Sequence, residues 1–185
     1  MELQILHWFE QLQNPVTNPI MYGFTLLGEF GAVWIVLAVA MLFFLPKRYR
    51  KIGLTVAIAL IFSLIMCNGV MKNVVHRVRP FVTDPTFNNL YNVQSLITDW
   101  SFPSGHTSAS FAAALAIFMW KKKEGVAALI LAALISISRL YLTVHYPTDV
   151  LVSIVLGSLY GILAYLIVKW LIKKFPKMKK VLDKE

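Results

Sequence analysis

The sequence predicts an all-α fold, a polytopic bundle of transmembrane helices. Of its 185 residues, 58% are hydrophobic and the mean hydropathy is +0.66, whereas the apolar share of a soluble domain is closer to half. Five apolar stretches approach or exceed the roughly 20 helical residues that cross a hydrocarbon core about 30 Å thick. Their apolar residues do not alternate with a period of two, so helices are expected rather than strands.

The first element is an amphipathic helix over residues 1–13, MELQILHWFEQLQ. Its apolar side chains fall largely on one helical side, namely Leu3, Ile5, Leu6, Trp8, Phe9 and Leu12. Because this segment is too short to span a bilayer, we expect it to lie in the membrane interface, with completion of a sixth span as the alternative. A secretory signal is disfavoured, since Glu2 and Glu10 are present and a basic leader is not.

The spans follow in order. They are predicted at about 20–45, 51–75, 105–120, 125–143 and 148–170. The third is the shortest, and it can cross only if its ends lie in the interface or the bilayer thins locally. The whole chain is interpreted as one membrane-embedded domain, divided into an interfacial helix and turn, the spans with the site, and a basic tail, at 1–19, 20–170 and 171–185.

The net charge of +9 is distributed unevenly, with 14 of the 18 Lys and Arg residues at one end of the predicted bundle. They lie at 47–51, 121–123 and 169–184, and the positive-inside rule makes this end, with the C-terminus, cytoplasmic. We expect these cations to contact anionic lipids rather than nucleic acid. The long connection 80–104 then lies outside. So do the other four cations, Lys72, Arg77, Arg79 and Arg139.

The end of the second span, MKNVVHRVRPF, carries the first candidate motif. Lys72 and Arg79 are seven residues apart, which on a continuous helix places them on nearly the same side, two turns apart. Both could then reach one point. Pro80 is expected to end the helix and turn the chain into the loop. The alternative is a pair of cations that snorkel toward the headgroups.

The start of the third span, FPSGHT, is the second motif. Pro103 presets a turn and Ser104 can cap the helix, while Gly105 allows another group to approach the backbone. His106 projects from the first turn. The free N–H groups of a helix start bind anions and the serine hydroxyl adds a donor, so a phosphate would fit here. Alternatively, Ser104 is only a helix cap.

The third motif, SRLYLTVHYPTDV, joins the fourth and fifth spans. Arg139 offers a planar fork of donors for phosphate oxygens, and an arginine at membrane depth requires a partner or a function. His145 and Asp149 are four residues apart around Pro147, which fits the first turn of the last helix. A carboxylate that orients the imidazole is typical of an activated base or nucleophile. A hydrogen bond at a helix start, without chemistry, is the alternative.

These motifs lie at the outer ends of different spans, on one face of the predicted bundle. Cations, a hydroxyl, a helix N-terminus and two histidines are the groups that phosphoryl transfer requires. Asp149 is committed to His145, and Asp84 and Asp99 are scattered in the loop, so no carboxylate cluster for a magnesium ion is expected. We therefore expect a reaction without a metal or another cofactor.

The three motifs together closely resemble the signature of the type 2 phosphatidic acid phosphatase superfamily. Residues 72–80 fit K-x6-R-P, residues 103–106 are P-S-G-H, and residues 138–149 fit S-R-x5-H-x3-D. The resemblance covers about residues 50–170. That family includes bacterial lipid phosphatases and undecaprenyl pyrophosphate phosphatases, and it shares its site with vanadium haloperoxidases. Its core commonly has six spans, and here the first is shortened to the N-terminal helix.

The resemblance implies a role for each motif residue. His145 would be the nucleophile that forms a phosphohistidine, Asp149 would orient it, and His106 would protonate the leaving oxygen. The phosphate would be held by Lys72, Arg79, Ser104, Gly105 and Arg139.

The lipid substrate is left open. An outward-facing site suits undecaprenyl pyrophosphate, with phosphatidylglycerophosphate and phosphatidic acid as alternatives. The apolar residues of the loop are expected to rest in the interface and cover the lipid chain, namely Phe81, Phe87, Leu90, Tyr91 and Trp100. Glu29 could contact a headgroup or be a plain interfacial carboxylate. A soluble haloperoxidase conflicts with five spans, and a non-catalytic lipid-binding or transport protein does not require both histidines and Asp149.

Overall fold

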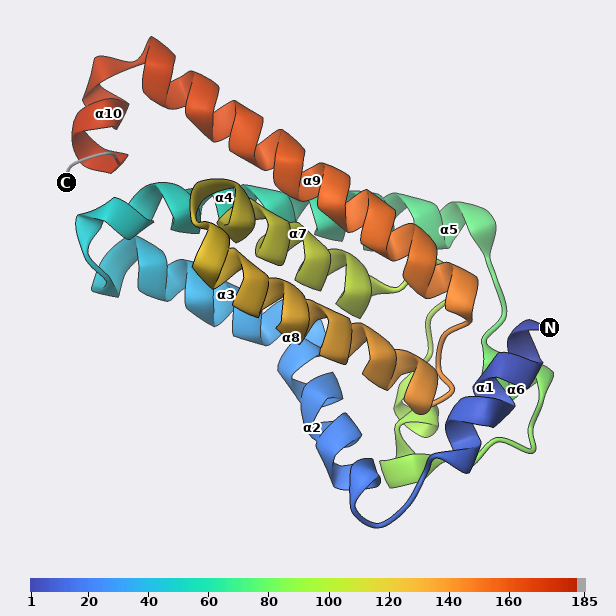
Figure 1. The fold of residues 1–185 in the computed structure, drawn as a ribbon. Helices are drawn as coiled ribbons and strands as arrows, with labels where there is room; N and C mark the ends of the chain where they lie inside the picture. The colour runs from blue at the N-terminus through green and yellow to red at the C-terminus, as the bar shows by residue number, and fades with distance from the viewer. Residues whose placement is uncertain (183–185) are drawn as a thin grey trace.

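The computed structural model describes residues 1–182, and all regular secondary structure among them is helical (Figure 1). The α-helices are α1 (Glu2–Gln11), α2 (Thr17–Gly28), α3 (Ala32–Val39), α4 (Arg50–Ser63), α5 (Lys72–Val75), α6 (Pro80–Thr83), α7 (Gly105–Trp120), α8 (Lys122–Tyr141), α9 (Pro147–Lys174) and α10 (Pro176–Leu182). Short 3-10 or π segments are η1 (Glu29–Gly31), η2 (Ala40–Phe44), η3 (Lys47–Tyr49), η4 (Leu64–Met71), η5 (Leu90–Asn92) and η6 (Gln94–Leu96). The predicted all-α class is confirmed.

Four helical stretches are long and apolar enough to cross a membrane, as expected of a multi-pass membrane protein. They are Thr17–Phe44, Lys47–Thr83, Lys122–Tyr141 and Pro147–Lys174. Four of the predicted spans therefore have their counterparts here. The basic segment after the last of them forms α10 up to Leu182, and Lys184 of the predicted tail lies outside the described residues.

Helix α7, the third predicted span, lies at the centre of the bundle (Figure 1) and is only 16 residues long, about 24 Å. At its first end the Ser104 amide donates to Ser153 Oγ near the start of α9. At its other end Trp120 Nε1 donates to Thr55 Oγ1 near the start of α4. It therefore joins the same two ends of the bundle as the long helices. None of its residues is exposed, because α4, α8 and α9 pack around it.

The close approach of α7 and α9 depends on two glycines. A Cβ on Gly157 would lie 2.4 Å from the Ser108 carbonyl oxygen, and one on Gly161 would lie 2.7 Å from that of Ala112. Larger residues would force the helices apart. This contact holds the starts of α7 and α9, which carry two of the three motifs, against each other.

The end of the second span differs from the prediction. A helix is expected as far as Pro80, but α5 ends at Val75 and His76 adopts a left-handed conformation with φ 49°. Arg79 is extended, and Pro80 begins the short helix α6 instead of ending a helix. Proline disfavours helical backbone in the residue before it and fits the first turn of a new helix. A turn, rather than a seven-residue helical spacing, brings Arg79 toward Lys72.

The first span bends at Phe30 and Gly31, where φ is 50° and 69° (Figure 1). Before the bend, α2 packs closely on α8, because a Cβ on Gly28 would lie 2.7 Å from Ile135 Cγ2. After the bend, α3 packs on α4 instead. The two halves of this span therefore have different neighbours.

Helix α1 forms as predicted and covers the end of the bundle where α9 begins (Figure 1). Leu6 is fully buried and packs with Phe87 and Tyr146. Glu2 accepts hydrogen bonds from Arg77 and Thr148. This helix and the loop that follows α6 together roof the end of the bundle.

The apolar residues of this loop are only partly available to a lipid. Phe87 is buried under α1, and Phe81 and Leu90 pack on a cluster around Tyr141. Tyr91 and Trp100 are exposed. Contacts with α1 and α8 therefore replace part of the predicted interfacial surface.

Candidate active site

The three motifs meet where α5 ends and α7 and α9 begin, at the right-hand end of the bundle in Figure 1. Lys72 and Arg79 are both buried and both bind Asp99 in the loop before α7. Lys72 Nζ donates to one carboxylate oxygen, and Arg79 Nη2 donates to the other at 2.5 Å. The two cations therefore converge on one anion, as the sequence predicts, although through a bent backbone.

The role of Asp99 is not predicted from the sequence, in which Asp84 and Asp99 are scattered along the loop. Burial of Asp99 opposes its ionisation, but the hydrogen bond and charge of Lys72, with the charge of Arg79, outweigh it and lower the pKa of Asp99 to about 2. The carboxylate thus stays charged at neutral pH. Another anion that binds both Lys72 and Arg79 competes with this carboxylate.

His145 lies at the centre of the cluster and is only 2% exposed. Its Nε2 is 3.2 Å from Arg79 Nη1, which also donates to the Val144 carbonyl oxygen at 2.7 Å. Its Nδ1 is 3.5 Å from Asp149 Oδ2, too far for a hydrogen bond, so the predicted hydrogen bond appears here as a longer contact. Burial and then the charge of Arg79 hold the pKa of His145 well below its ordinary value, so the imidazole is neutral.

Asp149 is fixed by other donors instead. Oδ1 accepts a hydrogen bond from Arg77 at 2.5 Å, and Oδ2 accepts from Ser101 Oγ at 2.5 Å and from the Tyr146 amide at 2.9 Å. Arg77 also lies 3.9 Å over the Tyr146 ring and binds Glu2 of α1. Arg77 and Ser101 are therefore further members of the site. In the sequence, Arg77 stands out only as a cation on the predicted outer face that fills no fixed position of the three motifs, and Ser101 does not stand out at all.

Ser104 acts as the helix cap that the sequence allows. Its Oγ accepts from the Thr107 amide at 3.4 Å, and its side chain is fully buried. Gly105 lies against the second span as predicted, because a Cβ there would lie 2.9 Å from Asn68 Oδ1 of η4, although the exposed Asn68 side chain could turn away. The start of α7 thus combines a capped helix N-terminus with a tight contact to the second span.

His106 and Arg139 complete the cluster. His106 Nε2 lies 3.5 Å from Glu29 Oε2, so Glu29 is placed beside a motif histidine. Arg139 is 3% exposed, and Nη1 donates to Thr25 Oγ1 at 3.0 Å. Within residues 1–182, Arg139 forms no salt bridge, although a buried arginine ordinarily requires an anion.

Buried polar atoms without a partner gather at these motifs. Over residues 1–182 there are four such side-chain atoms: His106 Nε2, Thr107 Oγ1, Arg139 Nε and His145 Nδ1. His106 Nε2 and His145 Nδ1 each lie 3.5 Å from a carboxylate oxygen, of Glu29 and Asp149. Buried polar groups are normally hydrogen-bonded, so the other two, Arg139 Nε and Thr107 Oγ1, indicate a place that a polar ligand completes. With three nearby cations, the ligand class that fits is an oxyanion.

Comparisons with known proteins agree with this chemistry. A family model described as the PAP2 superfamily matches residues 49–173. The chain is 34% identical over 134 residues to the undecaprenyl-diphosphatase of Sulfolobus acidocaldarius, covering 71% of this chain but 63%, less than two thirds, of that protein. It is 32% identical over 182 residues to phosphatidylglycerophosphatase B of Bacillus subtilis, and the match covers 91% of this chain and 81% of that protein. The crystal structure of a transmembrane PAP2 type phosphatidylglycerolphosphate phosphatase from Bacillus subtilis matches with a TM-score of 0.69 at 28% identity. The match covers 94% of this chain and 85% of that chain.

Proposed function

The chain belongs to the PAP2 superfamily, and from this premise we propose that it is a membrane phosphatase that converts undecaprenyl pyrophosphate to undecaprenyl phosphate without a metal ion. The observation that carries the proposal is the unpaired buried Nε of Arg139 together with Lys72 and Arg79, all close enough to His145 for their charges to act on it. The identity with an undecaprenyl-diphosphatase supports the substrate. Phosphatidylglycerophosphate is the second candidate, because phosphatidylglycerophosphatase B aligns over 91% of this chain.

The proposed reaction has two steps. The neutral Nε2 of His145 attacks the terminal phosphorus, the bridging P–O bond breaks, and His106 gives a proton to the leaving oxygen. Water then attacks the phosphorus of the phosphohistidine, His106 takes a proton from this water, the bond from phosphorus to His145 Nε2 breaks, and inorganic phosphate leaves. Lys72, Arg79 and Arg139 neutralise the phosphoryl oxygens, and the orientation of His145 depends on Asp149.

The proposal is tested by measuring phosphate release from purified protein with undecaprenyl pyrophosphate, phosphatidylglycerophosphate and phosphatidic acid, each with excess EDTA. We expect the highest kcat/KM for undecaprenyl pyrophosphate and no loss of activity in EDTA. A strict magnesium requirement would contradict the metal-free mechanism. Preference for phosphatidylglycerophosphate would establish the second candidate instead, and no release from any lipid would exclude a phosphatase.

The charge distribution supports an extracytoplasmic site. Leu96 lies in the loop over the site and is 78% exposed, whereas Lys123 is exposed at the other end of the bundle. After replacement of the buried Cys67, we expect Leu96→Cys in intact cells to react with a membrane-impermeant thiol reagent and Lys123→Cys to react only after lysis. The reverse labelling pattern would place the site on the cytoplasmic side.

A further inference from the structure

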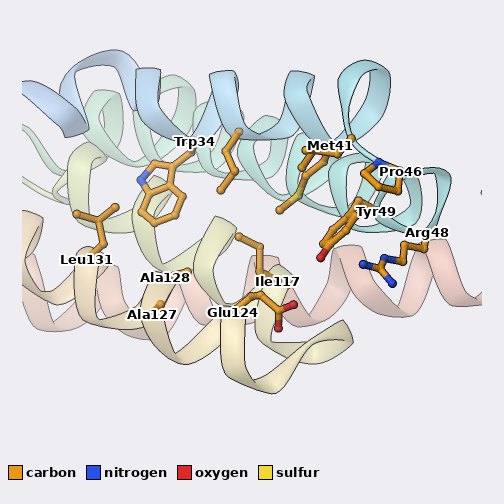
Figure 2. Close-up of a pocket in the computed structure, with 12 residues that line it drawn as sticks. Trp34, Met41, Pro46, Arg48, Tyr49, Ile117, Glu124, Ala127, Ala128 and Leu131 are labelled. Atoms are coloured by element: carbon orange, nitrogen blue, oxygen red, sulfur yellow. The ribbon is translucent and has the colours of Figure 1, made fainter.

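A groove of about 610 Å³ runs between α3 and α8 (Figure 2). Trp34 and Met41 lie on one wall, and Leu131 and Ala128 of α8 lie on the other, with Ile117 of α7 between them (Figure 2). Its volume falls within the range of roughly 300–1,000 Å³ that is usual for ligand sites. The groove follows from the bend at Gly31, because α2 packs on α8 whereas α3 packs on α4.

Helix α7 connects this groove to the site. His106 and Ile117 are eleven residues apart, which is close to three full turns and places both on the same side of α7. Between them, Ser110 accepts a hydrogen bond from Trp34 Nε1 at 2.9 Å. Ser110 is one turn, about 6 Å, beyond His106. The groove therefore begins about one helical turn from the histidine.

Helix α8 carries a matching row of side chains. Ile135 lies at the level of His106, because a Cβ on Gly28 would meet both residues, at 2.7 and 2.8 Å. The groove residues that follow on the same side of α8 are Leu131, Ala128 and Glu124. The row begins beside the site and ends at the basic end of the bundle, where Arg48 and Glu124 bound the groove (Figure 2).

We propose that this groove holds the hydrocarbon tail of the lipid, as one long polyprenyl chain. This assignment rests on the proposed function. In a lipid pyrophosphate, the bridging oxygen that leaves is joined to the hydrocarbon tail through the phosphate that stays on the lipid. When this oxygen lies at His106, the tail therefore starts a few ångströms away from His106. That position is the end of the groove that Trp34 lines.

The length of the groove favours a polyprenyl chain over a diacyl lipid. From Trp34 to Arg48, the lining residues at its two ends, the first span covers 14 residues, about 21 Å at the rise of a helix. This length exceeds half the hydrocarbon thickness of a bilayer, which is about 15 Å. The acyl chains of a phospholipid reach only the middle of the bilayer, whereas a polyprenyl chain is long enough to fill the whole groove.

The first test fills the groove. Ala127 is an exposed lining residue of α8, and its neighbour Val126, 48% exposed, does not line the groove. We expect Ala127→Phe to lower the ratio of kcat/KM for undecaprenyl pyrophosphate to that for dimethylallyl pyrophosphate by about tenfold. The single isoprene unit of the latter is too short to reach Ala127. The matched variant Val126→Phe should keep the wild-type ratio.

A second measurement uses the wild-type protein, so that a folding defect of the variant cannot decide the outcome. A polyprenyl pyrophosphate with a diazirine in its tail should label peptides that contain residues 34–48 and 124–131, and undecaprenyl pyrophosphate should compete. Labelling confined to the outer face of α9, or an equal ratio for both variants, would overturn the groove assignment. If wild-type protein released no phosphate from either substrate, the proposed function itself would fail.

Discussion

Replacement of His145 by alanine is expected to lower kcat for every substrate by at least about 10⁴-fold, because both steps of the proposed reaction pass through its ring. The substitution leaves Lys72, Arg79 and Arg139 in place. Vanadate binding, which depends on these cations, should therefore change much less than turnover. Rapid-quench assays and calorimetric titration of vanadate would separate the two quantities.

The covalent intermediate can be observed directly. With substrate labelled in its terminal phosphate, wild-type protein should give an acid-labile, base-stable phosphoprotein, and His145→Ala should give none. Asp149→Asn is the matched control, because it keeps the size of the Asp149 side chain while it removes the charge and replaces one acceptor oxygen with an amide donor. It should slow formation of the intermediate without abolishing it. A phosphohistidine that persists in His145→Ala would assign the nucleophile to another residue.

The direction in which pH affects the attack by His145 follows from its surroundings. Burial, followed by the charges of Arg79 and Arg139, lowers the pKa of His145 well below its ordinary value of 6.5. The attacking imidazole therefore remains neutral as the pH falls through 6.5. The acidic limb of kcat/KM that belongs to His145 is expected below that pH.

The convergence of the three motifs could be predicted from the sequence because each lies at the end of an apolar span. The length of each apolar stretch fixes where a span ends. Because successive spans cross the membrane in opposite directions, the end of one and the start of the next lie on the same face. This reasoning places His106, Arg139 and His145 together without any knowledge of how the helices pack. The same reasoning explains why the bounds of α7 are predicted correctly although this helix is short.

The contacts made by the loop could not be predicted in this way. Asp99 binds Lys72 and Arg79 only because the backbone turns at His76, and a left-handed histidine has no clear sequence signal. Likewise, Ser101 and Arg77 meet Asp149 through the tertiary path of two loops. Local patterns specify helices, whereas a loop takes its course from the surfaces that it covers.

Replacement of His106 by alanine should have an effect that depends on the leaving group. A general acid contributes about 10²–10⁴-fold when the departing oxygen is basic. A lipid monoester expels an alkoxide, so phosphatidic acid hydrolysis should lose a factor of that size in His106→Ala. p-Nitrophenolate is a weak base and needs little protonation, so p-nitrophenyl phosphate should lose far less. The measurement compares kcat/KM of His106→Ala with that of wild type for both substrates.

The pyrophosphate substrate makes this comparison sharper. Its leaving oxygen belongs to a phosphate, which is also a weak base, so His106→Ala should affect undecaprenyl pyrophosphate about as mildly as the aryl ester. His145→Ala serves as the control, because it should abolish turnover of all three substrates alike. Glu29→Gln should follow the pattern of His106→Ala with smaller factors, since Glu29 Oε2 lies 3.5 Å from His106 Nε2. Equal losses on all three substrates in His106→Ala would remove the general-acid role. His106 would then act as a further ligand of the phosphate, together with Lys72 and Arg79.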